Sequence, residues 1–250
     1  MARSERIFYL LCGSLLIAGT VLFIGGGSQH PPTDARLGPV GSDEFFRNFV
    51  RHVLAHPNWE LIHAGILAGP LCWALGSVGA ALRLRELGES RFGVLGVTAL
   101  AMGAAAWAVT FVFDGFVALR IAQAIGAASP GEAPALYAAF HANQVVVIRL
   151  GLVSLMLIGA GMAAFGVSIL CIDVPRHATQ WVLGSTGIAL GLWPSAACAL
   201  GIFRPGPFTS PAWTATALLT GAWFLLLGLR LIVTGARGAA HRNHAVGPVT

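Results

Sequence analysis

The sequence predicts an all-α integral membrane protein, a six-transmembrane-helix bundle with a short amphipathic surface helix on its outer side. Of its 250 residues, 56% are hydrophobic and only 10% are charged, whereas a soluble domain carries about 25% charged residues. The mean hydropathy is +0.76. Six apolar stretches also reach the roughly 20 residues that a helix needs to cross a bilayer. Together these observations exclude a water-soluble globular domain.

Turn-forming or charged residues separate the six predicted spans. The first follows Arg3 and Arg6 and resembles a signal peptide, but its apolar run is longer than a typical signal core and no A-x-A site follows it. We therefore expect it to be a retained span. The predicted spans are Ile7–Gly27, Asn58–Leu82, Phe92–Leu119, Val145–Ile172, Trp181–Phe203 and Ala212–Thr234. The helices of the third and fourth spans are expected to cover 92–127 and 134–171, and therefore to project beyond the bilayer as a hairpin.

A short amphipathic helix is predicted over 42–55, between the first two spans. Ser42 is the expected N-cap, and Asp43 and Glu44 lie in the first turn. The apolar stripe consists of Phe45, Phe46, Phe49, Val50 and Val53. A helix of this kind beside a span is expected to lie on the membrane surface.

The distribution of arginine predicts the orientation. With an even number of spans both termini lie on one side, and the segments on that side carry more arginine than the others, which places them in the cytoplasm. We expect an inner (plasma) membrane protein with a transmembrane domain over 1–235 and a flexible cytoplasmic tail over 236–250. Because the arginines occur singly between apolar runs, the expected partners are the lipid bilayer and other membrane subunits, not nucleic acid.

Ionisable residues gather toward the outer ends of the second, third and fourth spans. An ionisable side chain at the centre of a membrane helix costs about 2.5–3.5 kcal/mol on insertion scales, which makes it a functional candidate. Matching the heights of antiparallel neighbours places His63, Asp114 and Arg149 at a similar depth. An Asp114–Arg149 ion pair is the simplest structural interpretation.

The spacing of three of these residues suggests a metal site. His56, Glu60 and His63 follow one another at i, i+4 and i+7, which is one helical face. Imidazole and carboxylate on one face suit copper, zinc or iron. Asp114 and His141 are the residues expected to complete this site from neighbouring helices.

Haem b is the alternative cofactor. It would take His63 and His141 as axial ligands from two helices, with Arg149 facing a propionate. Either cofactor points to a multi-pass membrane protein with a His/carboxylate site in a redox role.

Other classes of function remain open. The polar cluster could instead hold together the helices of an accessory subunit of a larger membrane complex. A transporter fits less well, because its polar residues should occupy both halves of the bilayer, and a quinone pocket has no specific motif here. No nucleophile or oxyanion donor set accompanies Glu60 or His63, so catalytic residues are not assigned.

Overall fold

The computed structural model describes residues 2–30, 37–39, 42–172, 178–199 and 211–243, and within these ranges it is helical with no strand. Side chains are not described at 198–199, 211–214 and 237–243. The elements are α1 (Arg3–Gln29), α2 (Asp43–Ala55), α3 (Trp59–Glu86), α4 (Arg91–Val112), the π-helical turn η2 (Phe113–Val117), α5 (Ala118–Ala127), α6 (Ala133–Leu170), α7 (Ala178–Ala199) and α8 (Pro211–Asn243).

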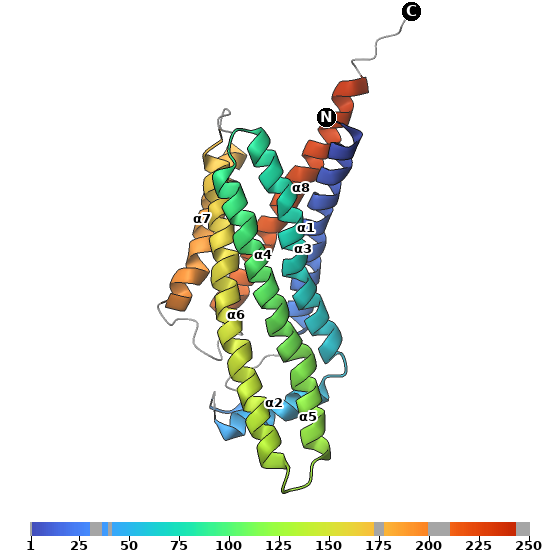
Figure 1. Ribbon diagram of the computed structural model, residues 1–250, viewed down its shortest axis with the longest axis vertical. Helices are drawn as coiled ribbons and strands as arrows, with labels where there is room; N and C mark the ends of the chain where they lie inside the picture. Colours follow the sequence, from blue (N-terminus) through green and yellow to red (C-terminus); the bar gives the residue numbers. More distant parts are fainter. Residues whose placement is uncertain (1, 31–36, 40–41, 173–177, 200–210, 244–250) are drawn as a thin grey trace, which may run out of the picture.

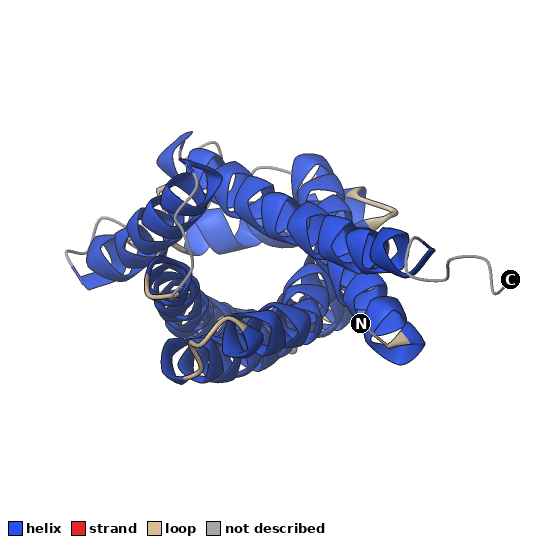
Figure 2. Ribbon diagram, turned by 90° about the horizontal axis from the view of Figure 1, so that it is seen from above, coloured by secondary structure: helices blue, strands red, loops and turns tan. Residues whose placement is uncertain are grey.

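The long helices form a ring, visible from above in Figure 2. Around the ring α1 contacts α3, α3 contacts α4, α4 contacts α6, α6 contacts α7, and α8 closes the ring between α7 and α1. The start of α1 and the end of α8 lie at the same end of the bundle (Figure 1). The α5–α6 hairpin and α2 lie at the opposite end, which we call the hairpin end.

Five helices in the described part of the chain are long and apolar enough to cross a membrane: Arg3–Gln29, Trp59–Glu86, Arg91–Ala127, Ala133–Leu170 and Ala215–Ala236. The predicted all-helical fold is therefore confirmed for the described residues. The fifth predicted span corresponds to α7, which is not among these five. The end of that predicted span, 200–203, lies outside the described residues.

The predicted hairpin of long helices is confirmed. The helix that begins at Arg91 continues through η2 to Ala127, and α6 runs for 38 residues. At 1.5 Å per residue α6 is roughly 57 Å long, which exceeds the roughly 30 Å of bilayer hydrocarbon. Both helices therefore extend past their neighbours at the hairpin end (Figure 1).

The helix α2 begins as predicted, but its apolar stripe faces protein and not a membrane surface. The hydroxyl of Ser42 accepts a hydrogen bond of 3.1 Å from the Phe45 N–H, as an N-cap does. The projecting hairpin offers the stripe an apolar surface, so α2 packs on α5 and α6. The residues of this cluster are Phe45, Phe46, Phe49, Val50, Val53, Trp59, Ala118, Ala122 and Phe140.

At the other end, α8 continues to Asn243 as a helix, into the region expected to form a flexible tail over 236–250. Residues 244–250 of that predicted tail lie outside the described residues.

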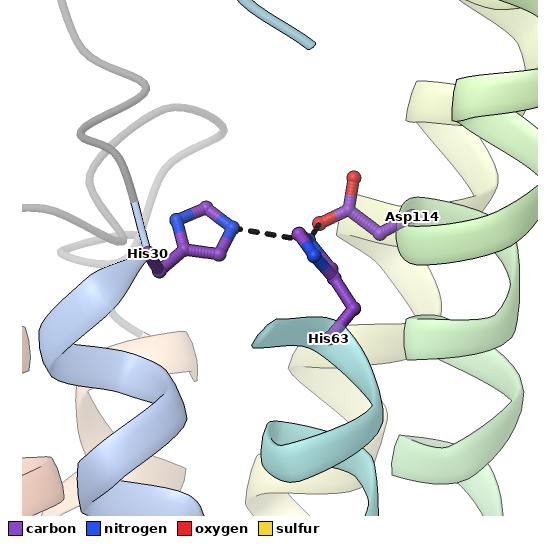
Figure 3. A group of neighbouring side chains, drawn as sticks. All are labelled: His30, His63 and Asp114. Atoms are coloured by element: carbon purple, nitrogen blue, oxygen red, sulfur yellow. Dashed lines mark hydrogen bonds and ion pairs between the residues drawn. The ribbon is translucent and has the colours of Figure 1, made fainter. Parts of the chain in front are cut away.

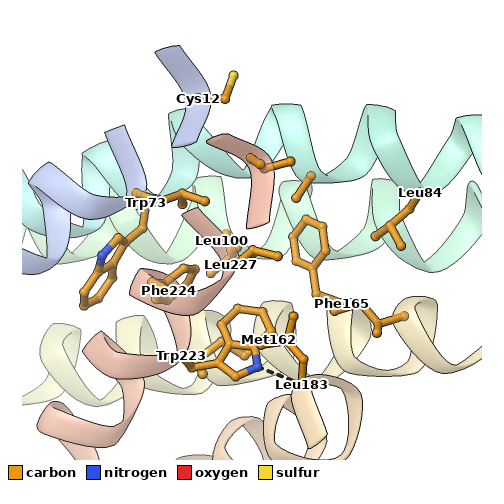
Figure 4. Close-up of a cluster of buried hydrophobic side chains, with 14 of the residues drawn as sticks. Cys12, Trp73, Leu84, Leu100, Met162, Phe165, Leu183, Trp223, Phe224 and Leu227 are labelled. Carbon is orange, nitrogen blue, oxygen red and sulfur yellow. Dashed lines mark hydrogen bonds between the residues drawn. The ribbon is translucent and has the colours of Figure 1, made fainter. Parts of the chain in front are cut away.

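The main core lies inside the ring (Figure 4). Trp73 stacks on Phe224 with ring centroids 4.5 Å apart, and the Trp223 indole N–H donates to the Leu183 carbonyl at 2.9 Å. Close helix contact depends on small residues. A Cβ atom at Gly159 or Gly191 would overlap the backbone oxygen of the other glycine, so these two positions allow α6 and α7 to touch.

A buried carboxylate, Glu89, ties the start of α4 to α6. It is 7% exposed and accepts hydrogen bonds from the N–H groups of Phe92 (2.9 Å) and Gly93 (3.2 Å) and from the Ser168 hydroxyl. Burial by itself raises the pKa of this carboxyl. The hydrogen bonds from Ser168 and from the backbone outweigh burial and hold the pKa below its ordinary value of 4.5.

Replacing this carboxylate should destabilise the protein in a pH-dependent way. Glu89→Gln should lower the free energy of unfolding in detergent by roughly 1–3 kcal/mol at neutral pH, because charged hydrogen bonds are lost. Since the folded pKa is depressed, this stabilisation is complete above the ordinary pKa and is lost as pH falls through the folded value. Thermal unfolding should therefore show a gap between wild type and variant that narrows in acid. Glu44→Gln, at an exposed carboxylate in the first turn of α2, is the control and should lower the free energy of unfolding by less than about 1 kcal/mol.

Candidate metal site

Two histidines and an aspartate from three different elements meet near the hairpin end (Figure 3). His30 follows the last residue of α1, His63 lies one turn into α3, and Asp114 lies in η2. The Nε2 atoms of His30 and His63 are 3.2 Å apart. Nε2 of His63 is also 3.4 Å from Oδ2 of Asp114. One ligand atom from each residue lies within 4.8 Å of the other two.

The centre of this group is removed from solvent. His63 is fully buried, Asp114 is 8% exposed and His30 is half-buried. A buried carboxylate without a compensating partner costs several kcal/mol. The close approach of His63 and Asp114 is therefore favourable with a proton between Nε2 and the carboxyl oxygen, or with a metal ion in the place of that proton.

A hydrogen bond within α3 fixes the tautomer of His63. Its Nδ1 atom lies 2.7 Å from the backbone carbonyl oxygen of Trp59, one turn earlier. A carbonyl oxygen only accepts, so Nδ1 carries the hydrogen. In the neutral ring the lone pair then belongs to Nε2, the atom that faces His30 and Asp114. Metal-binding histidines are oriented in the same way by a bond from their other nitrogen.

The π-helical turn η2 presents Asp114 to His63. A π turn inserts an extra residue into a helix, and such turns occur frequently at functional sites. Side chains from both neighbouring helices hold this turn. The Trp59 indole N–H donates to the carbonyl of Asp114 at 3.0 Å, and the Asn143 amide donates to the carbonyl of Phe113 at 3.2 Å.

The second oxygen of the carboxylate is also held. Nε2 of Gln144 donates to Oδ1 of Asp114 at 3.4 Å, while Oδ2 faces His63. The aspartate therefore has a fixed orientation, with one oxygen directed into the group. Two imidazole nitrogens and one carboxylate oxygen that leave further positions open form a known ligand set for zinc and for non-haem iron.

Of the five predicted metal ligands, the structure brings two together, His63 and Asp114. Glu60 is half-buried at the start of α3 and forms an ion pair with Arg120, with Oε1 of Glu60 3.6 Å from Nη2 of Arg120. It is therefore engaged with α5 and does not belong to the group around His63.

The other two predicted ligands also lie outside this group. The ring of His56 packs against His52, with centroids 4.5 Å apart. His141 is exposed, and its ring packs against Phe46 of α2 with centroids 4.3 Å apart. The pair proposed for haem, His63 and His141, is thus not assembled around a common point among the described residues.

Arg149 does not pair with Asp114. It is exposed on α6, and the side-chain partners recorded for Asp114 are His63 and Gln144. The similar depth predicted for Asp114 and Arg149 therefore does not bring their side chains together.

His30 is not among the ligands predicted from the sequence. The position of His30 in the sequence could have indicated a ligand role. His30 follows the first apolar run, and the second span begins at the same end of the bundle. His30 and His63 are therefore expected at similar depths. Asn143 and Gln144, which support η2, carried a weaker signal as amides at the start of an apolar run.

Comparison of the chain with models of protein families, with curated proteins and with solved structures gives no match. The arrangement of the site residues is therefore what indicates a function for the protein.

The close contact of η2 with α3 gives a prediction. A Cβ atom at Gly115 would overlap Cβ of His63, so Gly115→Ala must push η2 away from α3. Overpacking of this kind costs about 1–3 kcal/mol. We expect a lower midpoint of thermal unfolding and a weaker site for divalent cobalt. Gly126→Ala, where the new Cβ would make only an ordinary contact with Leu54, should behave as wild type; an unchanged Gly115→Ala variant would contradict the described packing.

Proposed function

We propose that the protein is a multi-pass inner-membrane protein that binds a transition-metal ion at His30, His63 and Asp114, near the outer face of the membrane, in a redox role. The observation that carries this proposal is the fixed tautomer of His63. Its hydrogen bond to Trp59 leaves Nε2 as the lone-pair atom, and the donor atoms of the other two residues face the same point. An ion at this point would take the place of a proton on Nε2 and neutralise Asp114.

The donor set favours iron, copper or zinc. Calcium and magnesium prefer sites made of oxygen ligands, whereas imidazole nitrogen suits the later transition metals. Two histidines and one carboxylate with open positions are typical of non-haem Fe(II) sites. Iron and copper change oxidation state, which is the basis for the redox role.

Haem b receives less support than a metal ion. The 3.2 Å contact between the Nε2 atoms of His30 and His63 leaves no room for a macrocycle between the two rings. The alternative axial ligand, His141, packs against Phe46.

The proposed topology has six spans, with α7 as the fifth, and both termini in the cytoplasm. The shared position of the start of α1 and the end of α8 supports an even number of crossings (Figure 1). The turn between α3 and α4 lies at that same end and is bordered by Arg83, Arg85 and Arg91. Arginine near span ends favours the cytoplasmic side.

The runner-up function is that of an accessory subunit, favoured by the surface of α6. Arg149 is exposed among exposed apolar residues, including Val145, Val146, Val153 and Met156. A charged residue within a span usually faces a partner or an aqueous cavity. Proteins that co-purify with the chain in a fixed ratio in mild detergent, together with a chain free of metal, would favour this function.

The orientation can be tested with reporter fusions. A phosphatase that is active only outside the cytoplasm should be active when fused at Gly131, in the hairpin turn, and inactive at Arg85. The reverse pattern would contradict the proposed orientation. Activity at both positions would contradict the proposed number of crossings between them.

The metal site can be tested by metal analysis of the purified protein, with its absorption spectrum. Asp114→Asn, which keeps the shape of the side chain, and His63→Ala should each lose one equivalent of bound metal, because each removes a ligand. His141→Ala is the control and should keep it, whereas a haem held by His63 and His141 would give a Soret band that both histidine variants lose. Equal metal content in wild type, Asp114→Asn and His63→Ala would contradict the proposal.

A further inference from the structure

Four imidazole rings surround the buried indole of Trp59, and two of them do not belong to the site described above. The ring centroids of His63 and His30 lie 4.4 and 5.5 Å from that of Trp59. Those of His52 and His56 each lie 6.4 Å away. A second pair of histidines, at the end of α2, therefore contacts the same indole ring as the histidines of the candidate metal site.

The geometry of this second pair suits a shared ion. His52 lies in the last turn of α2 and His56 follows the helix, at i and i+4. The two ring centroids are 4.5 Å apart. With metal–nitrogen bonds of about 2.0–2.1 Å, two imidazoles on one ion have centroids no more than roughly 6 Å apart. The pair meets this condition without movement of the backbone.

The tautomer of His56 is fixed in the same way as that of His63. Its Nδ1 atom lies 2.7 Å from the carbonyl oxygen of His52. Because the carbonyl accepts, Nδ1 carries the hydrogen and the lone pair of the neutral ring belongs to Nε2. Unlike His63, His52 and His56 are half-buried residues, so the pair is partly exposed to solvent although Nε2 of His52 is buried.

We propose that His52 and His56 form a second transition-metal site, which takes one ring nitrogen from each residue. This inference rests on the proposed function in one respect, which is the class of metal ion that is bound. With two neutral ligands and no carboxylate, the second site binds more weakly than His30, His63 and Asp114. The chain then holds two ions at its hairpin end, one buried and one accessible.

Titration of the full-length protein in detergent with divalent cobalt, followed by cobalt absorption and bound-metal content, tests this inference. Wild type should bind two equivalents in two phases. His52→Gln/His56→Gln should lose the weaker phase and keep the tighter one. Asp114→Asn should lose the tighter phase and keep the weaker one. His141→Gln, at an exposed histidine outside both groups, is the control and should retain both phases.

The outcomes separate the two proposals. If only one equivalent binds and only Asp114→Asn removes it, the second site is wrong and the proposed function stands. If only His52→Gln/His56→Gln removes an ion, the second site stands and the proposed function fails. One equivalent that both variants remove indicates a single shared site and overturns the second-site inference. The absence of any bound cobalt in wild type overturns both.

Discussion

The hydrogen bond from Nδ1 of His63 to the carbonyl of Trp59 is the interaction on which the site depends. It spans one turn of α3, and it decides which nitrogen of a fully buried imidazole is the acceptor. Once Nε2 is that acceptor, an aspartate oxygen and a second imidazole nitrogen can approach it with a proton or a cation between them. The grouping of His30, His63 and Asp114 is therefore a consequence of helix packing and of burial.

The surrounding structure holds three polar groups together inside an apolar bundle. Trp59 both accepts the bond from His63 and donates to the carbonyl of Asp114, so one residue aligns His63 and the turn that carries Asp114. Asn143 and Gln144 fix the π-helical turn and its carboxylate from α6. The absence of a side chain at Gly115 lets this turn approach α3. These supporting contacts to His63 and Asp114 come from α3, α6 and η2, and sites built on helices are more precise than sites on loops.

Much of the fold follows from the sequence, because apolar length and N-cap chemistry are local properties. The start of α2 at Asp43 and the two long helices of the hairpin were predicted in this way. The similar depth of His63 and Asp114 was also predictable from the matched heights of antiparallel helices. The apolar stripe of α2 was not assigned correctly, since the same stripe suits a membrane surface or a protein surface, and only the projecting hairpin distinguishes them.

The direction in which a side chain points around its helix axis was harder to predict than its depth along the bundle. Arg149 lies five residues after Gln144, which is about 140° around an ideal helix, so Gln144 faces Asp114 while Arg149 faces away. The π turn adds a rotation that no periodic pattern in the sequence reveals. His30 joins the site only because α1 packs beside α3, a contact between different segments. Glu60 and His141 were chosen for their residue type and height, but their actual partners, Arg120 and Phe46, are set by α5 and α2.

X-ray absorption fine structure at the metal edge tests the central claim most directly, because it reports the ligand atoms around the bound ion. Protein loaded with one equivalent of metal should show nitrogen or oxygen neighbours at about 2.0–2.2 Å, with the outer-shell scattering of two imidazole rings. Asp114→Asn should change this first shell. A spectrum with sulfur neighbours, or one without imidazole scattering, would contradict a site made of His30, His63 and Asp114.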